Sequence, residues 1–342
     1  MKLTPAEAVN LVELHGGLRA ASRATGIPKS TLRDQLVRWR ASESLVQLPE
    51  LPSELEDVET LWRKAEERFD RVRRAKEARR WIDIKINTSQ PIGLAFSADT
   101  HLDDPGADLR LARQHRETIV DTEGMFAIFA GDVLNNWPKG GRLASLHAHS
   151  AVTEDEGRRL ALHHLEGFGA KLLACIWGNH ELFSGHDLVR WLGDRLTCIA
   201  EQDEARLRIT FANGRQVTMV VRHTFPGTSQ WNPAHGVMKA AQMGFDADLL
   251  VSGHIHTSAG APIIANPISG KLTHCLQISS YKIYDKYAVE KGFRPGAPIP
   301  CPVAIVDPLA EKPIDFITVM PNPEKASLLL GALRAKTPKI VS

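Results

Sequence analysis

The sequence predicts an α/β protein in which two packed β-sheets are flanked by helices, preceded by a small all-α domain and a linker helix. From residue 82 onward, short apolar runs alternate first with helical stretches and later follow one another closely. Residues 1–41 show helical spacing throughout. The chain has 342 residues, 43% hydrophobic and 24% charged, so it can bury a large core, and disordered and fibrous classes are excluded.

Residues 1–41 have the pattern of three short helices. Thr4 followed by Pro5 is typical of a helix cap and first turn, and glycines at 16, 17 and 26 separate the helical stretches. The last stretch repeats apolar residues at helical spacing, at Leu32, Leu36 and Trp39. A tight glycine turn before a final helix predicts a helix-turn-helix unit.

The composition changes at residues 42–81, which we interpret as an acidic linker and a long helix. Between Ser42 and Thr60 there are six acidic residues and no basic ones. From about Ser53 to Arg80 the apolar residues are spaced alternately three and four apart, as in a coiled coil, at Leu55, Val58, Trp62, Ala65, Phe69 and Val72. The stripe covers only about two and a half heptads. Two interpretations stay open: a homodimer through the 53–80 helix, or docking of this helix on the following domain of its own chain.

Residues 82–321 are assigned to one domain of strands and helices. The predicted strands are Ile92–Ser97, Met125–Ala130, Lys171–Trp177, Arg206–Ile209, Val217–Arg222, Leu249–Ser252, Cys275–Ser279, Val303–Asp307 and Ile314–Val319. Helices are expected at Leu109–Thr122 and Asp155–Leu165. Residues 322–342 are expected to form a tail that begins with a short helix.

Composition and charge exclude several classes of protein. Lys and Arg number 42 against 40 Asp and Glu, and the formal charge of +2 predicts no generally polycationic surface. The four cysteines are scattered without a Cys-x-x-Cys pair, which fits a reducing compartment. The first apolar stretch contains Glu7 and Glu13 and lacks the core of a signal peptide. No apolar run approaches the ~20 residues of a membrane helix, so we expect a cytoplasmic protein without membrane contact.

Five short segments place metal-capable side chains directly after apolar runs. They are Asp99-Thr-His101, Gly131-Asp132, Gly178-Asn179-His180-Glu181, His223 and Gly253-His254-Ile-His256. Because the ends of parallel strands converge on one crevice, these side chains are expected to meet. Asp, Asn and His supply oxygen and nitrogen ligands suited to divalent Mn, Fe, Zn or Ni. Two such ions about 3.5 to 4 Å apart need a carboxylate between them.

The ordered set Asp-x-His, Gly-Asp, Gly-Asn-His-Asp/Glu, His and Gly-His-x-His resembles the pattern of the calcineurin-like metallophosphoesterase superfamily. The resemblance extends over about residues 92 to 260. It implies a metal-dependent phosphoric ester hydrolase with two divalent ions, of which Mn²⁺ is the first choice. It further implies a first ion held by Asp99, His101 and His256, a bridging Asp132, and a second ion held by Asn179, His223 and His254.

The same resemblance implies catalytic roles for His180 and Asn135. His180 is left without a metal and faces the substrate, as general acid for the leaving oxygen or as a stabiliser of phosphoryl charge. Some relatives place an Asp three residues after the bridging Asp to orient this histidine, whereas this chain has Asn135. An amide can hold the imidazole but does not stabilise its cation as a carboxylate does. We therefore expect weaker proton donation from His180, which the pH–rate profile of Asn135→Asp tests.

The segment GLRAASRATGIPKSTLRDQLVRWR resembles helix-turn-helix domains of the recombinase and Fis-like kind over about 35 residues. Residues 1–40 hold seven basic and three acidic side chains, a local excess that favours a polyanionic partner. The last helix of such units enters the major groove, so DNA contacts are expected from Lys29, Ser30, Thr31, Arg33 and Arg38. Docking of another protein is the alternative role for this unit.

Two further groups of residues have open roles. His147 and His149, with Arg142 nearby, either line a substrate groove or lie on a solvated loop. Tyr281, Lys282 and Tyr284 either form a wall of the substrate site or pack in the core and on the surface.

These observations together predict a nuclease or phosphodiesterase whose N-terminal unit recruits DNA, an arrangement that looks like that of a phage or prophage protein. One alternative is an enzyme for a small phosphoester, with the helical unit used for assembly. Another is a DNA-binding regulator with a silent catalytic domain. The complete set of ligand residues argues against the silent domain.

Overall fold

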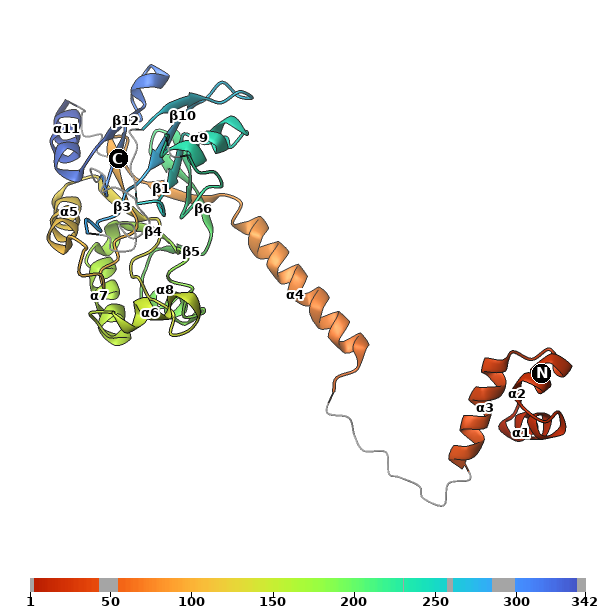
Figure 1. The fold of residues 1–342 in the computed structure, drawn as a ribbon. Helices are drawn as coiled ribbons and strands as arrows, with labels where there is room; N and C mark the ends of the chain where they lie inside the picture. Colours follow the sequence, from red (N-terminus) through yellow and green to blue (C-terminus); the bar gives the residue numbers. More distant parts are fainter. Residues whose placement is uncertain (1–2, 43–54, 230, 257–260, 285–298, 337–342) are drawn as a thin grey trace. The chain divides into compact units, whose positions relative to one another are not determined.

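The computed structural model describes residues 3–42, 55–229, 231–256, 261–284 and 299–336. The chain divides into two compact units, Met1–Asp70 and Arg71–Ser342, which Figure 1 shows with their labelled elements. The first unit contains the helical N-terminal segment, and the second contains both sheets. No helix among the described residues is long and apolar enough to span a membrane.

The N-terminal segment forms three short helices, as its sequence predicts. They are α1 (Pro5–Leu14), α2 (Leu18–Thr25) and α3 (Lys29–Ser42). Thr4 caps α1 by accepting a hydrogen bond from the backbone of Glu7, whose carboxylate accepts one from the backbone of Thr4 in return. The helices pack around the fully buried residues Ala8, Ala21 and Leu32.

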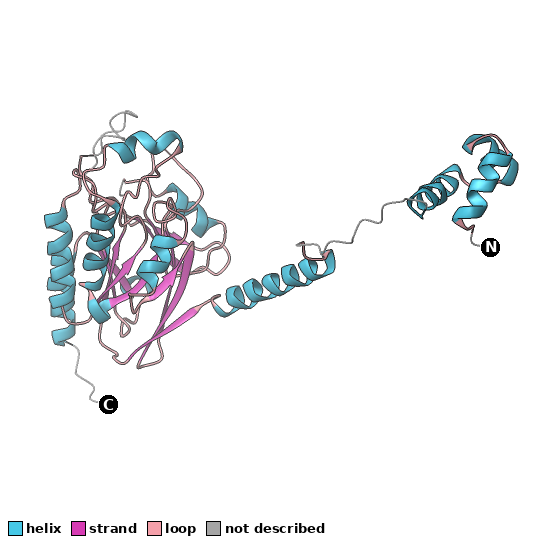
Figure 2. Cartoon of the chain, turned by 90° about the horizontal axis from the view of Figure 1, so that it is seen from below, coloured by secondary structure: helices cyan, strands magenta, loops and turns pink. Residues whose placement is uncertain are grey.

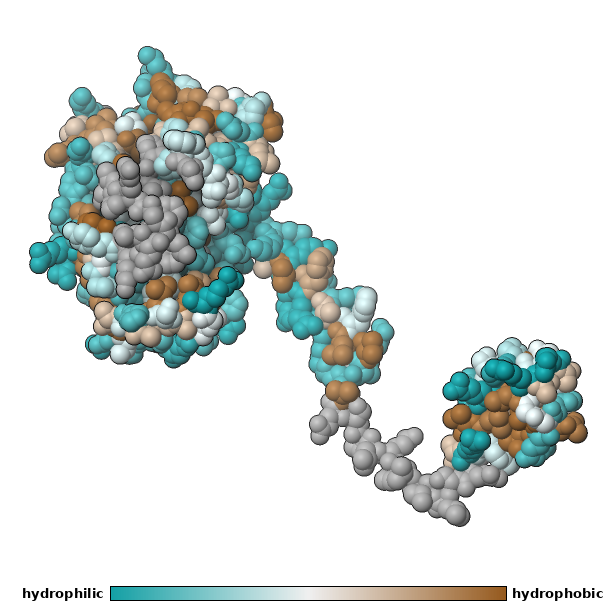
Figure 3. Space-filling model, in the orientation of Figure 1, coloured by the Kyte–Doolittle hydropathy of each residue, from teal (hydrophilic) through white to brown (hydrophobic). Residues whose placement is uncertain are grey.

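The linker helix α4 (Val58–Ala78) begins five residues later than the sequence predicts. Its start is set by Asp57, whose carboxylate accepts a hydrogen bond of 2.9 Å from the backbone nitrogen of Thr60. The start of the predicted linker, at 43–54, lies outside the described residues. No residue of α4 is buried, and apolar side chains of its stripe are exposed, among them Val58, Trp62, Phe69 and Val72. Figure 3 shows brown, hydrophobic atoms along this helix.

One of the two sheets has the order β12-β11-β2-β3-β4-β5. The parallel strands are β2 (Ile92–Ser97), β3 (Met125–Phe129), β4 (Leu172–Ile176) and β5 (Ile199–Glu201). The antiparallel edge consists of β11 (Val303–Val306) and β12 (Ile317–Met320). An apolar cluster packs the outer face of this sheet against α5 (Leu109–Asp121), α7 (Glu154–Glu166), α8 (Asp187–Gly193) and α11 (Pro323–Lys336).

The other sheet has the order β1-β6-β7-β8-β10-β9. Its strands are β1 (Ile82–Ile86), β6 (Glu204–Phe211), β7 (Gln216–Arg222), β8 (Leu249–Ser252), β9 (Ile263–Ala265) and β10 (Leu272–Gln277). Here β7, β8 and β10 are parallel neighbours, and α9 (His235–Gln242) packs on the outer face. The core between the sheets includes Phe96 and Ile128 from one sheet and Met219 and Val251 from the other. Figure 2 shows the strands enclosed by helices.

The predicted fold class is confirmed, with local corrections. The sequence places a strand at Ile314–Val319, but residues Pro313–Asp315 form a 3-10 turn and the strand begins at Ile317. Three strands, β1, β5 and β9, and the helices α8 and α9 were not predicted. Strands β5 and β9 have three residues each, too few to show a period. The alternation Ile-Asp-Ile-Lys-Ile of β1 is a half-buried strand pattern that could have been found.

The remaining short elements are α6 (Ala144–Ala148) and two 3-10 turns, Gly141–Leu143 and Gly169–Lys171.

His164 on α7 should make the second unit sensitive to acid. Burial, together with the charge of Arg116 and the neighbouring His163, lowers the pKa of His164 to about 3. Since this is below the value of about 6.5 in an unfolded chain, stability is complete above pH 6.5 and is lost as the pH falls toward 3. We expect that, in EDTA, the loss of unfolding free energy between pH 7.5 and pH 5 is smaller in His164→Leu than in the parent by about 1 to 2 kcal/mol. Equal losses in urea titrations of both proteins would contradict this.

Candidate metal centre

The five metal-capable segments follow strands that lie side by side in the two sheets. Asp99 and His101 come after β2, Asp132 after β3, and Asn179 and His180 after β4, three parallel neighbours of one sheet. His223 comes after β7, and His254 and His256 after β8, parallel neighbours in the other sheet. The carboxyl ends of both sets therefore face the same edge of the sandwich, as the sequence predicts.

The first cluster contains Asp99, His101 and His256. The Nε2 atoms of the two histidines are 3.0 Å apart, and Nε2 of His256 is 3.4 Å from Oδ1 of Asp99. Asp99 and His101 are buried. Two ligands at about 2.1 Å from one ion and at ordinary coordination angles are themselves about 3.0 to 3.4 Å apart. The donor atoms of this cluster thus have the separations that a single cation needs.

The second cluster contains Asp132, His223 and His254. Nε2 of His223 is 3.0 Å from Oδ2 of Asp132 and 3.1 Å from Nδ1 of His254. The ring of His223 is oriented by its other nitrogen, Nδ1, which donates 2.8 Å to the carbonyl of Ala130. The two clusters are adjacent, because the backbone nitrogen of His254 donates 2.8 Å to Oδ2 of Asp99.

The backbone is strained at these ligands. Among the described residues other than glycine, six have a positive φ, and five of them lie in the metal-capable segments: Asp99, His101, Asp132, His254 and His256. The sixth, Asn136, is four residues after Asp132. The left-handed region costs an L-residue energy and is populated where the surroundings require it. The concentration of this strain at five of the seven predicted ligands marks the strand ends as a functional site independently of any sequence motif.

Unpartnered buried oxygens provide a test of whether cations fit here. Among the described residues, Oδ1 of Asp99 and Oδ1 of Asn179 are buried and accept no hydrogen bond. Buried acceptors of this kind are rare unless another group satisfies them. Together with a donor set of carboxylate, amide and imidazole and no thiolate, they suit divalent Mn, Fe, Zn or Ni. The residues present fit two divalent cations.

The electrostatics of the second cluster are dominated by Asp132 and His223. Burial raises the pKa of the Asp132 carboxyl, but the charges of His223 and His180 outweigh it and lower this pKa to about 2. Burial likewise lowers the pKa of His223, and the Asp132 carboxylate outweighs it and raises this pKa to about 10. The two shifts have one cause, the attraction between the Asp132 carboxylate and positive charge on the neighbouring imidazole.

Glu181 holds together the segments that carry the metal ligands after β3 and β4, a role that the sequence did not reveal. Its carboxylate is fully buried and accepts hydrogen bonds from the backbone nitrogens of Asp132, Val133 and Gly178, at 2.9, 2.7 and 2.7 Å. Burial and the nearby Asp132 charge raise the pKa of Glu181 to about 7, against these donors. Its place in Gly-Asn-His-Glu was the only available signal. Glu181 joins the segments after β3 and β4.

Gly178 has no room for a side chain. A Cβ atom at this position would overlap the Asp132 carboxylate and lie 2.9 Å from the Asp132 backbone nitrogen. We expect Gly178→Ala to displace Asp132 and to weaken metal retention about tenfold or more. Loss of a contact that orients a metal ligand without touching the metal typically lowers metal affinity about 10- to 100-fold. Metal content after dialysis against graded EDTA measures this. Gly193→Ala is the control because no atom lies within 4 Å of its Cβ position, and equal losses in the two variants would contradict the prediction.

His180 is oriented by Asn135, but through the backbone and not through the amide that the sequence suggested. Nδ1 of His180 is 2.5 Å from the backbone carbonyl of Asn135, whereas the Asn135 amide donates 2.9 Å to Oδ2 of Asp104. The amide oxygen of Asn135 in turn accepts a hydrogen bond of 3.5 Å from Nζ of Lys282, which also pairs with Asp104. A carbonyl only accepts, so Nδ1 carries the hydrogen and Nε2, 3.7 Å from Oδ2 of Asp132, is the atom that can exchange a proton. The expected contact of the Asn135 amide with the His180 ring is therefore wrong, whereas weaker proton donation from His180 stays a prediction.

Aromatic and charged neighbours enclose His180. Its ring lies 4.9 Å from that of Trp137 and 4.6 Å from that of Phe183. The side chain of Lys282 is 5% exposed, pairs with Asp104 at 2.9 Å and has its Nζ 5.8 Å from the centre of the Trp137 ring. Lys282 thus belongs to the wall of the site.

The two tyrosines beside Lys282 in the sequence lie elsewhere than in this wall. Tyr281 is buried, with its hydroxyl 2.9 Å from Nδ1 of His115, and Tyr284 is exposed.

The remaining predicted residues belong to elements that carry none of the expected metal ligands. The five expected DNA contacts are on α3 and are all exposed: Lys29, Ser30, Thr31, Arg33 and Arg38. His147 lines a cavity beside the centre, whereas His149 and Arg142 do not line it. Exposure on α3 is necessary for DNA contact but does not distinguish it from other roles.

No protein-family model matches the chain, and no curated protein matches its sequence. Among solved structures it is similar to the calcineurin-like phosphoesterase YfkN from Bacillus subtilis, with 12% identity and a TM-score of 0.36 over 64% of this chain and 85% of that one. It is similar to Vps29 from Cryptosporidium parvum, with 12% identity and a TM-score of 0.33 over 64% and 86%. A metallophosphoesterase from Sphaerobacter thermophilus matches with 11% identity and a TM-score of 0.28 over 72% and 95%. At these values the likeness assigns no activity to the chain.

Proposed function

We propose that this protein is a phosphoesterase that depends on two divalent metal ions, and that it acts as a phosphodiesterase or nuclease on DNA. The observation that carries the activity is the convergence of Asp99, His101 and His256 into one cluster and of Asp132, His223 and His254 into another. Two bound divalent cations would supply Lewis-acid polarisation of a phosphoryl oxygen and compensate its charge. Manganese is the first metal to test.

Residues of the chain itself would position the ester and transfer the proton. The backbone nitrogen of His180 holds Oδ1 of Asp132 at 3.0 Å, which keeps the carboxylate in a fixed orientation. Nε2 of His180, with Nδ1 fixed by the Asn135 carbonyl, is placed to donate a proton to the leaving oxygen. Trp137 and Phe183 pack beside the His180 ring and limit the access of water.

Recruitment of DNA is proposed for the N-terminal helices. The exposed basic residues of α3, together with the local positive excess of residues 1–40, support binding to a polyanion. We expect the full chain to bind duplex DNA with a salt-dependent affinity, and the double variant Arg33→Ala/Arg38→Ala to weaken that binding at least tenfold. Salt-independent binding, or an unchanged affinity of the variant, would assign the unit to protein docking or assembly instead.

The activity is tested with the full chain and Mn²⁺. We expect hydrolysis of bis-p-nitrophenyl phosphate, and cleavage of labelled single-stranded or duplex DNA at a higher kcat/KM than that of nucleotide monoesters. Preference for a monoester would favour the small-molecule enzyme. Retention of metal without hydrolysis of any ester would favour a regulator with a silent domain.

We also propose that α4 pairs with α4 of a second copy in antiparallel orientation. The apolar stripe has coiled-coil spacing, residues 54–60 hold four acidic and no basic side chains, and residues 68–78 hold five basic and two acidic ones. Antiparallel pairing would bring these opposite charges together. Sedimentation equilibrium should give a dimer for the parent and a dissociation constant at least tenfold higher for Trp62→Glu/Phe69→Glu. A monomeric parent at micromolar concentration would contradict the pairing.

A further inference from the structure

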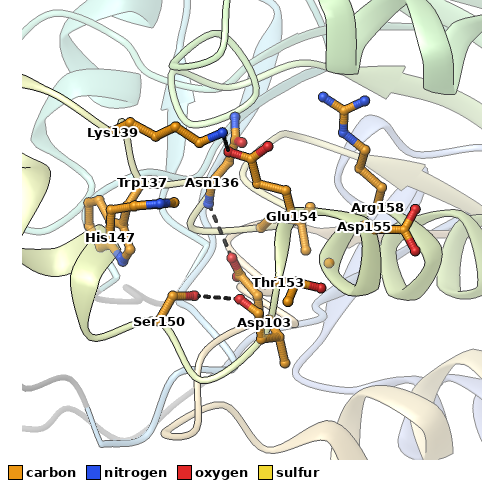
Figure 4. A pocket seen from close by; sticks show the side chains of 13 residues that line it. Asp103, Asn136, Trp137, Lys139, His147, Ser150, Thr153, Glu154, Asp155 and Arg158 are labelled. Atoms are coloured by element: carbon orange, nitrogen blue, oxygen red, sulfur yellow. Dashed lines mark hydrogen bonds and ion pairs between the residues drawn. The ribbon is translucent and has the colours of Figure 1, made fainter.

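A cavity of about 420 Å³ lies beside the metal centre. It is enclosed by Asp103, by the segment from Leu134 to Lys139 that follows β3, by His147 of α6 and by the start of α7 (Figure 4). Its volume is in the range of pockets that bind small organic molecules. The predicted metal ligands do not line it, so it is a separate subsite.

The segment after β3 connects the cavity to the reacting centre. Trp137 lines the cavity and its ring contacts His180 at 4.9 Å between ring centres. Asn136 also lines the cavity, and its amide donates 2.6 Å to the backbone carbonyl of His180. A molecule in the cavity is thus one side chain away from the proposed proton donor, as expected for the part of a substrate next to the scissile phosphate.

One end of the cavity is aromatic. Trp137 and His147 lie together at this end in Figure 4. The Trp137 ring is held in place by Phe183, whose ring is 6.3 Å away and nearly parallel, and by Lys282 near its centre. A fixed indole ring is a stacking surface for a planar heterocycle, and stacking of a base on such a ring is worth about 1 to 3 kcal/mol.

The other end presents a cation. Lys139 pairs with Glu154 at 2.9 Å, and Asp155 with Arg159 at 4.0 Å, so the charges of these four side chains are compensated. Arg158 lines the cavity opposite Trp137 in Figure 4, and within the described residues no carboxylate lies within 4.0 Å of its guanidinium, although its charge acts on Glu154, which is already paired with Lys139. A guanidinium in this position suits a phosphate group, which it can bind with two hydrogen bonds.

We propose that this cavity binds a nucleotide of the substrate strand, with its base against Trp137 and a phosphate at Arg158. The proposal rests on the proposed phosphodiesterase function and specifies its substrate class. An aromatic surface and a cation at opposite ends match a heterocycle and a phosphate joined by a sugar. A peptide phosphorylated on serine or threonine would supply the anion but not the planar ring.

Binding is measured first, on the full chain in EDTA, so that no turnover is needed. We expect calorimetry to show thymidine 5′-monophosphate binding at least tenfold more tightly than inorganic phosphate. Arg158→Ala should weaken thymidine 5′-monophosphate binding tenfold or more, and Trp137→Leu at least fivefold. Arg159→Ala is the matched control, because Arg159 is the next residue of α7 and does not line the cavity, and should change the affinity less than twofold. Equal affinities for nucleotide and phosphate, or equal effects of Arg158→Ala and Arg159→Ala, would overturn the proposal.

Turnover then distinguishes this proposal from the proposed function. With Mn²⁺, Arg158→Ala should raise KM at least tenfold for an oligothymidylate and less than twofold for bis-p-nitrophenyl phosphate. If no ester is hydrolysed but thymidine 5′-monophosphate still binds through Arg158, the nucleotide-binding cavity is supported and the proposed phosphoesterase activity is wrong. If bis-p-nitrophenyl phosphate is hydrolysed but Arg158→Ala changes neither the binding of thymidine 5′-monophosphate nor the KM for the oligothymidylate, the phosphoesterase activity is supported and the nucleotide-binding cavity is wrong. An oligothymidylate that binds no more tightly than the mononucleotide would overturn the assignment to a strand.

Discussion

Asp132→Asn should lower kcat/KM for bis-p-nitrophenyl phosphate by about 10³-fold or more and reduce the metal content from two equivalents to one or none. Asp132 is the carboxylate of the second cluster, 3.0 Å from Nε2 of His223, and it is held by the backbone of His180. An amide of the same shape keeps the packing but removes the negative charge that two cations would share. Elemental analysis of the dialysed protein and initial rates with Mn²⁺ give the two readouts.

Asp121→Asn is the control for this substitution, because it also converts an aspartate to an asparagine, at the exposed end of α5. It should leave both the rate and the metal content within about twofold of the parent. Two equivalents of metal and a near-parental rate in Asp132→Asn would show that Asp132 is not a ligand of the metal centre. The proposed function would then lose the residue on which the second cluster depends.

Glu181→Ala should lower the free energy of unfolding by about 3 to 5 kcal/mol. Its carboxylate is the acceptor for three buried backbone nitrogens, and each donor left without a partner costs about 1 to 3 kcal/mol. The effect should be present in EDTA, because it arises from the backbone of the segments after β3 and β4 and needs no metal. Urea unfolding of the parent and the variant in metal-free buffer measures it.

Glu181→Asp separates the loss of the acceptor from the loss of volume. It retains a carboxylate that is one methylene shorter, so it should keep some of the three hydrogen bonds and fall between parent and Glu181→Ala. A loss below about 1 kcal/mol in Glu181→Ala would mean that water replaces the carboxylate as acceptor. The metal ligands would then be held together by the strand ends alone.

Much of the site could be predicted because its ligands follow strands with strong apolar patterns. The run IGLAFS of β2 is buried along its whole length and ends two residues before Asp99, and the buried strand β8 likewise ends two residues before His254. Strand β3 is buried except at its second residue and ends three residues before Asp132. Parallel strands bring their ends to one edge, so the segment order alone indicated that these residues meet. The orientation of individual side chains was not predictable in this way, since Asn135 turned its amide to Asp104 and its carbonyl to His180.

The sequence by itself determined the residue types of the centre, their order along the chain and the strands that carry them, because local apolar patterns specify buried strands. Only the tertiary structure decided which sheet carries each ligand of the two expected clusters, that Glu181 accepts hydrogen bonds from three backbone nitrogens, and that Trp137 and Arg158 border one cavity. These contacts join residues from different strands, helices and loops. Their distances depend on the packing of one sheet on the other and of α7 against the segment after β3, for which no local pattern exists.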